Sequence, residues 1–318
     1  MKCPRCSHNQ PRKGGMTCYQ CRYRFVLDPK VDGMADGRFA AAVDQASAHG
    51  TLCYTSSQLY SVLCRATASK RVGWMVLVAF LCIAVSVVLN TGWPMLLVPV
   101  AILVNWLFLR AGFVSRSDLD RKKFNGLWQR YRAAMAAEDL SRWIDKPALH
   151  EAPAEWTDPD IHQYGAEGVL IVDSDHLVDW LVRNDFHITE KVLVVSASGY
   201  PDYIAQYATT LIDNRPDMPV FVLHASSGKG QMVRKELVAS GFIGLTGAST
   251  VIDLGLGPES VKALRPLRAL PVRREAITPD MVGYAALSTV LAACIVQQAA
   301  IQAALANSVD GGVELDFG

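Results

Sequence analysis

The sequence predicts an α/β protein in three parts: a short cysteine-rich module, a two-helix transmembrane hairpin and a doubly wound cytosolic domain. Two Cys-x-x-Cys pairs lie near the N-terminus, 38 consecutive residues carry no charge, and short apolar runs alternate with helical stretches after residue 168. A chain of 318 residues is long enough for two domains. Its net charge of +1 excludes a general polyanion binder, while 51% apolar residues and a positive mean hydropathy favour a membrane segment.

The first candidate site is a metal site formed by four cysteines near the N-terminus. Each Cys-x-x-Cys pair is a knuckle that can hold two thiolates on one side of a metal, and the intervening hairpin joins the pairs into a closed tetrahedral site. The chain opens without an apolar signal segment, so reduced, metal-binding thiols are expected. The sequence therefore predicts a zinc ribbon over residues 1–30 with one structural Zn²⁺. The ligands are Cys3, Cys6, Cys18 and Cys21.

Basic charge is concentrated in the same segment. Residues 1–30 carry seven basic side chains against Asp28 alone, which offsets the charge of −2 of a zinc tetrathiolate. The excess also permits contact with phosphate, so nucleic acid is a candidate partner, although an unidentified cytosolic protein is preferred. The seven are Lys2, Arg5, Arg12, Lys13, Arg22, Arg24 and Lys30.

The uncharged stretch predicts a transmembrane helical hairpin over residues 71–110. As one helix it would be about 57 Å long, nearly twice the hydrocarbon core of a bilayer. The sequence Asn-Thr-Gly-Trp-Pro at 90–94 divides it into spans of 18 residues each, 72–89 and 92–109. Both flanks are basic and the turn is neutral, so both termini are expected in the cytoplasm. This predicts an inner-membrane protein with membrane lipid as a partner; a buried helical hairpin in a soluble core is the alternative.

Two segments flank the hairpin. Residues 31–70 are expected to be a helical or winged-helix-like segment. Residues 111–150 are expected to form a juxtamembrane helix and a linker, with Ser117 as the N-cap and Asp120 three residues on. Aromatic residues recur along this helix at helical spacing, so it either lies on anionic lipid or packs on the cytosolic domain.

Residues 151–275 have the pattern of a doubly wound domain. Apolar runs at 168–173, 191–196 and 219–224 resemble buried parallel strands, and 249–255 is a fourth candidate. Helical stretches at 174–185, 201–214 and 230–240 alternate with them, and ligands of such domains bind at the carboxyl ends of the strands. Residues 276–318 are expected to form a terminal packing helix, begun by Thr278 and Pro279, and a tail.

The block from Val169 to Gly230 resembles the Toprim domain of the topoisomerase VI A subunit and the related meiotic double-strand-break proteins. In that family the first strand ends in an acidic residue, the second in a Gly-x-Gly-x-Pro-Asp loop and the third in an Asp-x-Asp pair. The stretch LIVDSD matches the first strand, with Asp173 at the acidic position. The stretch VVSASGYPDYIAQY matches the second, and PVFVLHASSGKG occupies the position of the third.

The chain departs from the family at the residues that would carry chemistry. His224 and Ser226 stand where the two aspartates belong. A weaker match, TSSQLYSVLCR, resembles the helix that carries the family's nucleophilic tyrosine, and Ser61 takes that place with Tyr60 one residue early. The alternative for this helix is a spacer whose apolar residues pack. The residual acidic candidates are Asp173, Asp175, Asp202 and Asp253, and the candidate ligand-binding residues are Ser198, Gly199, Tyr200, Ser227, Gly228 and Lys229.

Two functions from different classes follow. The first is a membrane-anchored, non-catalytic protein, a pseudoenzyme whose ribbon and degenerate Toprim-like domain bind a partner or ligand at the membrane face. The second is a membrane-tethered DNA-cleaving enzyme that uses Mg²⁺ held by the residual carboxylates. The substituted Asp-x-Asp pair favours the first, because Mg²⁺ is held by few carboxylates and each of them matters.

Overall fold

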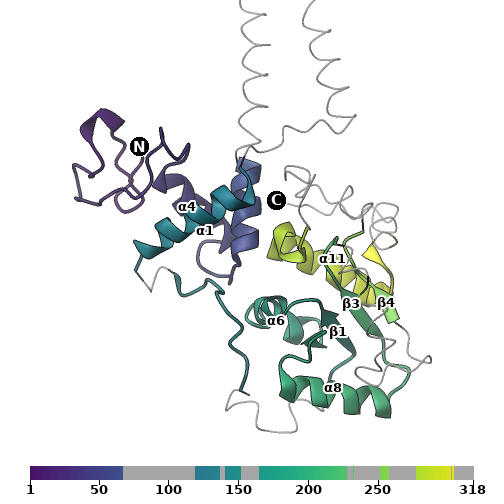
Figure 1. Cartoon of the computed structure of the whole chain (residues 1–318). Helices are drawn as coiled ribbons and strands as arrows, with labels where there is room; N and C mark the ends of the chain where they lie inside the picture. Colours follow the sequence, from purple (N-terminus) through teal and green to yellow (C-terminus); the bar gives the residue numbers. More distant parts are fainter. Residues whose placement is uncertain are drawn as a thin grey trace, which may run out of the picture. The chain divides into compact units, whose positions relative to one another are not determined.

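The structure is a computed structural model of the chain (Figure 1). It describes residues 1–66, 119–136, 140–151, 165–227, 232, 251–257, 277–301 and 303. The chain divides into two compact units, which are described separately. The first comprises Met1–Ala40, Tyr60–Ala134 and Pro266–Arg274, and the second Ala41–Leu59, Met135–Arg265 and Glu275–Gly318.

The first unit holds the cysteine-rich module, with the 3-10 helix η1 (Arg12–Gly14), the start of α1 (Asp36–Ala46) and all of α4 (Arg121–Ala133). Its core is aromatic. The buried ring of Phe39 stacks on three rings of α4, with centroids 6.3 Å from Phe124, 6.3 Å from Trp128 and 5.0 Å from Tyr131. The aromatic stripe of α4 is therefore packed against protein.

The start of α4 differs from the sequence prediction. Its N-cap is Asp120, whose Oδ1 accepts a hydrogen bond of 2.6 Å from the backbone N–H of Lys123. The predicted N-cap, Ser117, lies outside the described residues. A carboxylate is as good an N-cap as a hydroxyl and also complements the helix dipole, which explains the later start.

Residues 56–66 are helical, and the two candidates for a nucleophile's position are both buried in that helix. The Tyr60 hydroxyl donates to the carbonyl oxygen of Leu119 at 2.9 Å, and its ring lies 5.2 Å from that of Phe124. Ser61 is 0% exposed. Burial of Tyr60 and Ser61 favours the spacer alternative, in which these residues pack.

The second unit contains a parallel sheet, so the predicted α/β class is confirmed. Its strands are β1 (Gly168–Val172), β2 (Val192–Ser196), β3 (Val220–Leu223) and β4 (Val251–Asp253), in the order β2-β1-β3-β4. The helices are α6 (Asp175–Val182), α7 (Phe186–Thr189), α8 (Asp202–Asn214), the 3-10 helix η7 (Pro279–Val282) and α11 (Tyr284–Gln297). Figure 1 labels the main elements of this unit.

Both faces of this sheet are covered. Side chains of α8 form a core cluster with Val169 and Ile171 of β1. Leu170 and Val172 alternate with these residues, so they point to the opposite face, and both are fully buried. The strand order reverses between β1 and β3, which makes the carboxyl ends of these two strands the topological switch point where ligands of such folds bind.

The terminal helix begins later than the sequence predicts. Thr278 and Pro279 begin only the short helix η7, and Thr278 makes no side-chain cap bond. Gly283 has φ of 96°, a left-handed conformation that ends η7, and α11 begins at Tyr284. The predicted third helix, 230–240, lies outside the described residues apart from Met232.

The prediction of a two-helix transmembrane hairpin is corrected. Across the described ranges, no helix has both the length and the apolarity needed to cross a bilayer. A span needs about 20 apolar residues, whereas α11 and α8 have 14 and 13. The segment 71–110 itself lies outside the described residues. The hairpin, the inner-membrane location and the lipid partner are therefore not carried further.

Candidate metal centre and strand-end site

The two cysteine knuckles have the same backbone hydrogen-bond pattern. In the first, the N–H of Cys3 donates to His8 at 2.9 Å and that of Ser7 donates back to Cys3 at 3.0 Å. In the second, the N–H of Cys18 donates to Tyr23 at 2.8 Å and that of Arg22 to Cys18 at 2.9 Å. The two knuckles therefore have the same turn conformation, and the sulfur atoms of both lie close together.

The left-handed turn at the end of each knuckle is also repeated. Ser7 and Arg22, each directly after the second cysteine of its knuckle, both have φ of 59°. This conformation is costly for a residue other than glycine and persists only where surrounding contacts hold it. The repeated conformation indicates that the cysteine positions fix the backbone of both knuckles.

The four cysteine sulfur atoms lie close enough to hold a metal ion, all within 4.8 Å of one another. Cys3 and Cys21 are 3.5 Å apart at Sγ, and Cys6 and Cys18 are 3.6 Å apart. Sulfur atoms about 2.3 Å from a tetrahedral Zn²⁺ would be about 3.8 Å from one another, so the set fits such an ion. Among the described residues these four form the single cluster of this kind.

Backbone N–H groups prepare one of these thiols for metal binding. Hydrogen bonds from the N–H of Cys21, and more weakly from that of Gln20, lower the pKa of Cys18 to about 7 against the opposing effect of burial. A thiolate is the form that binds metal. Burial raises the pKa of Cys3, and against the backbone bond from His8, burial with the neighbouring thiols raises that of Cys6 to about 12, so the thiolate is favoured at Cys18 and not at these two ligands.

Two buried polar side chains brace the ribbon. The amide of Gln10 bridges the knuckles: its Nε2 donates to Thr17 at 2.9 Å and its Oε1 accepts from the N–H of Tyr19 at 3.0 Å. Asp36, at the start of α1 and 0% exposed, accepts from Val26 and Leu27. The metal centre is therefore held to α1 by a buried carboxylate.

The second candidate region lies where β1 and β3 end. Oδ2 of Asp173 accepts a hydrogen bond of 2.6 Å from the N–H of Ala225 and so ties the two strand ends together. Burial raises the pKa of Asp173, against the effect of that bond. The carboxylate expected to serve a metal therefore has a structural partner at the switch point.

His224, directly after β3, is buried and has a polar contact at each ring nitrogen. Nδ1 lies 2.8 Å from the carbonyl oxygen of Ala225, and Nε2 lies 3.2 Å from Oδ1 of Asp253. Both contacts are with oxygen atoms, which suits a ring that donates from both nitrogens. Burial alone would lower the pKa of His224, but its bonds to Asp253 and Ala225 and the charge of Asp173 raise it.

The other acidic candidates are not gathered around one point. Asp175 accepts from the hydroxyl of Ser198 at 2.7 Å, and Asp202 is the first residue of α8. Asp253 accepts from the N–H of Gly255 at 2.8 Å in addition to its contact with His224. The structure brings Asp173 and Asp253 to the same edge through His224, and gives Asp175 and Asp202 other surroundings.

The candidate ligand-binding loop forms its own hydrogen bonds. The Ser196 and Ser198 hydroxyls are 2.6 Å apart, and the buried Tyr200 donates its hydroxyl to Asp179 at 2.6 Å. Tyr200 is therefore a packing residue of the loop. Ser227 is partly exposed, and Gly228 and Lys229 lie outside the described residues.

Sequence reasoning missed Asp280 in the strand-end region and the partner of Ser226. Asp280, 6% exposed, accepts a hydrogen bond of 2.5 Å from the hydroxyl of Thr55, and its charge also contributes to the raised pKa of Asp173. Ser226 exchanges two hydrogen bonds with Ile277, of 2.8 and 2.9 Å. Both sets of partners are far apart in the sequence, so no local pattern predicts them.

Comparison with known proteins gave no match: no family model, no curated protein and no solved structure is significantly similar to this chain.

Proposed function

We propose that this chain is a non-catalytic binding protein whose N-terminal ribbon folds around one structural Zn²⁺ and presents a docking surface. The observation that carries the proposal is the set of four cysteine sulfur atoms within 4.8 Å of one another. Four thiolates around zinc leave no position for a substrate or water, so the metal supplies folding energy and no chemistry.

The strand-end region supports the non-catalytic part of the proposal. Mg²⁺ is held by hard anionic oxygen atoms, whereas at one of the two decisive positions His224 offers an imidazole whose nitrogens contact Ala225 and Asp253. At the other position, Ser226 is engaged with Ile277. Under this proposal the Toprim-like domain keeps the family's scaffold and loses its metal chemistry.

Metal content tests the ribbon. Protein purified without added metal is expected to carry about one zinc per chain by elemental mass spectrometry, because the site is closed and tetrahedral. Cys18→Ser should lose the metal, while Cys53→Ser should keep it, since Cys53 is a buried thiol outside the cluster. Protein without zinc, or Cys18→Ser protein with unchanged zinc, contradicts the proposal.

A cleavage assay tests the second function. Zinc-loaded protein is incubated with supercoiled and linear DNA, first with Mg²⁺ and then with Mn²⁺, and is expected to leave both intact. Asp173→Ala is the matched variant, because Asp173 is the acidic residue at the end of β1. Nicking that disappears in Asp173→Ala protein would overturn the non-catalytic proposal and favour the DNA-cleaving enzyme.

A further inference from the structure

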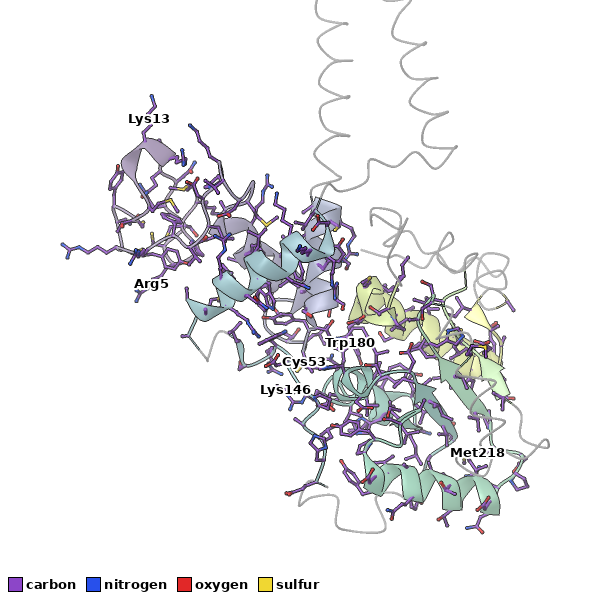
Figure 2. All side chains as sticks on the ribbon, viewed as in Figure 1. Arg5, Lys13, Cys53, Lys146, Trp180 and Met218 are labelled. Atoms are coloured by element: carbon purple, nitrogen blue, oxygen red, sulfur yellow. The ribbon has the colours of Figure 1, made fainter. Side chains whose placement is uncertain are left out.

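Residues 1–25 of the ribbon carry five exposed basic side chains that form no ion pair with another described residue. Across the part of the chain that the structure describes, none of the five forms an ion pair, whereas Arg12 pairs with Asp28 and Arg130 with Asp32. We call these five residues the basic set; they are Lys2, Arg5, Lys13, Arg22 and Arg24. In Figure 2 the labelled side chains of Arg5 and Lys13 extend away from the ribbon.

The basic set comes from both knuckles and from the hairpin between them. Arg5 lies between the cysteines of the first knuckle and Arg22 directly follows the second. Lys2 pairs with Asn9 in one β-bridge, and Arg24 pairs with Thr17 in the other. The positive charges are therefore distributed over the outside of one small module.

The field of these charges is strong because the module is small. A compact unit of about 25 residues has a radius of gyration of about 7 to 8 Å, so the basic set lies within roughly two Debye lengths at physiological salt. Seven basic residues against Asp28 leave +6 for residues 1–30, and a zinc tetrathiolate with its −2 leaves +4. A surface of this kind attracts polyanions.

One aromatic ring is exposed among these charges. Tyr19 is 63% exposed, and its ring lies against the backbone of η1, because a Cβ added to Gly14 would be 1.7 Å from the Tyr19 hydroxyl oxygen. Lys13 belongs to the same short helix. An exposed ring fixed beside cations can stack a base while the cations hold phosphate. An acidic protein segment would use the charges but has no need of the ring.

We propose that the ribbon binds single-stranded nucleic acid, with the basic set on the phosphates and Tyr19 stacked on a base. This inference rests on the proposed zinc site, because the metal holds the two knuckles in their relative positions. Arginine donates two parallel hydrogen bonds to phosphate, which suits the three arginines of the basic set.

The test uses the full chain and a fluorescent single-stranded oligonucleotide of about 25 nucleotides. Binding is followed by fluorescence anisotropy from about 50 to about 200 mM KCl, and three to five phosphate contacts predict a log–log salt slope of about −2 to −3.5. In Arg5→Gln/Arg22→Gln protein the slope should become shallower by about 1.4, which corresponds to about 25-fold weaker binding at about 100 mM salt.

Two sets of variants separate a specific surface from general charge. Arg142→Gln/Lys146→Gln changes the net charge of the chain equally at exposed residues of the second unit and should leave affinity unchanged. Tyr19→Ser should weaken binding by about 5-fold or more, while Tyr19→Phe retains it, because stacking needs only the ring. A duplex of the same sequence should bind more weakly than the single strand.

Several results would overturn the inference. One is the absence of oligonucleotide binding at about 50 mM salt. The others are an equal loss of affinity in the two double variants and a duplex that binds as tightly as the single strand. If a polyglutamate peptide displaces the oligonucleotide and Tyr19→Ser has no effect, the surface serves an acidic protein instead. Zinc content is measured on the same samples. Zinc-loaded protein that does not bind the oligonucleotide contradicts this inference alone, whereas protein without zinc contradicts the proposed function as well.

Discussion

Replacement of Asp36 by asparagine tests how the metal centre is attached to the helical part of its unit. Asp36 is 0% exposed. Its Oδ1 accepts from the N–H of Leu27 at 2.8 Å, and its Oδ2 accepts from the N–H of Val26 at 2.8 Å and from the Tyr23 hydroxyl at 3.0 Å. Burial and the charge of Asp36 raise the pKa of Tyr23, which keeps that hydroxyl protonated as a donor.

The expected loss follows from these three bonds. Asparagine has a single acceptor oxygen, so whichever way the amide turns, Val26 or Leu27 is left with a buried N–H that faces an NH₂ group. One orphaned buried N–H costs about 1 to 3 kcal/mol, and the bonds that remain lose their charge assistance. We expect Asp36→Asn to lower the free energy of unfolding by about 2 to 4 kcal/mol.

Two measurements check this value. Urea unfolding of zinc-loaded protein, followed by circular dichroism, gives the stability. Zinc transfer to a chromogenic chelator should be faster by about 30-fold or more, because 2 kcal/mol of local opening corresponds to that factor. Asp44→Asn, also on α1, is the control: its carboxylate is 56% exposed and pairs with the exposed His49, so the change should cost under about 1 kcal/mol. Equal stabilities of the two variants would refute the reasoning.

Two further predictions concern the strand-end region. Gly255→Ala should lower the free energy of unfolding by about 1 to 3 kcal/mol, because the added Cβ would lie 1.9 Å from Nε2 of the buried His224. The control is Gly257→Ala, whose added Cβ has no atom of the described residues within 4 Å and which should leave stability unchanged in the same urea assay. Equal effects of the two variants would exclude the clash. The second prediction compares the free energy of unfolding of wild type with that of His224→Gln as a function of pH. Because the pKa of His224 is raised in the folded state, the advantage of wild type should be fully present below about pH 6.5. It should decline as pH rises through the folded-state pKa, by at most about 1.4 kcal/mol per pH unit. Asp253, Asp173 and Asp280 are the charged groups that face this ring or its neighbour, and an advantage that grows with pH would contradict the sign.

The strands were predictable because their signal is local and redundant. The predicted runs 168–173, 191–196 and 219–224 contain β1, β2 and β3, and no predicted strand end differs from the observed one by more than one residue. Fully buried parallel strands are apolar on both faces, so consecutive residues carry the signal. The four cysteines were predictable for the same reason: knuckle spacing is a local property, and the hydrogen-bond pattern of the knuckles follows it.

Boundaries and buried polar contacts were not predictable to the same degree. The sequence pattern favours Ser117 as the N-cap of α4 with Asp120 three residues on, whereas in the structure Asp120 is itself the N-cap. In the sequence, Asp36 has the pattern of an ordinary carboxylate in the first turn of a helix. Its backbone donors, Val26 and Leu27, lie ten and nine residues earlier and reach it only through the tertiary fold. Such contacts depend on tertiary structure and leave no periodic signal.

The histidine directly after β3 has a physical consequence for the charge at this edge of the sheet. In a carboxylate site a divalent cation offsets the crowded negative charge at the strand ends. Here Nε2 of His224 lies 3.2 Å from Oδ1 of Asp253, and, against the effect of burial, the bond to Asp253 and the charge of Asp173 raise the pKa of His224. These contacts favour a positive charge on the ring, and the absence of a side chain at Gly255 leaves room for the ring, since any side chain there would collide with it. A protonated His224 would offset the negative charge of Asp173 and Asp253 at this edge, as a divalent cation does in a carboxylate site.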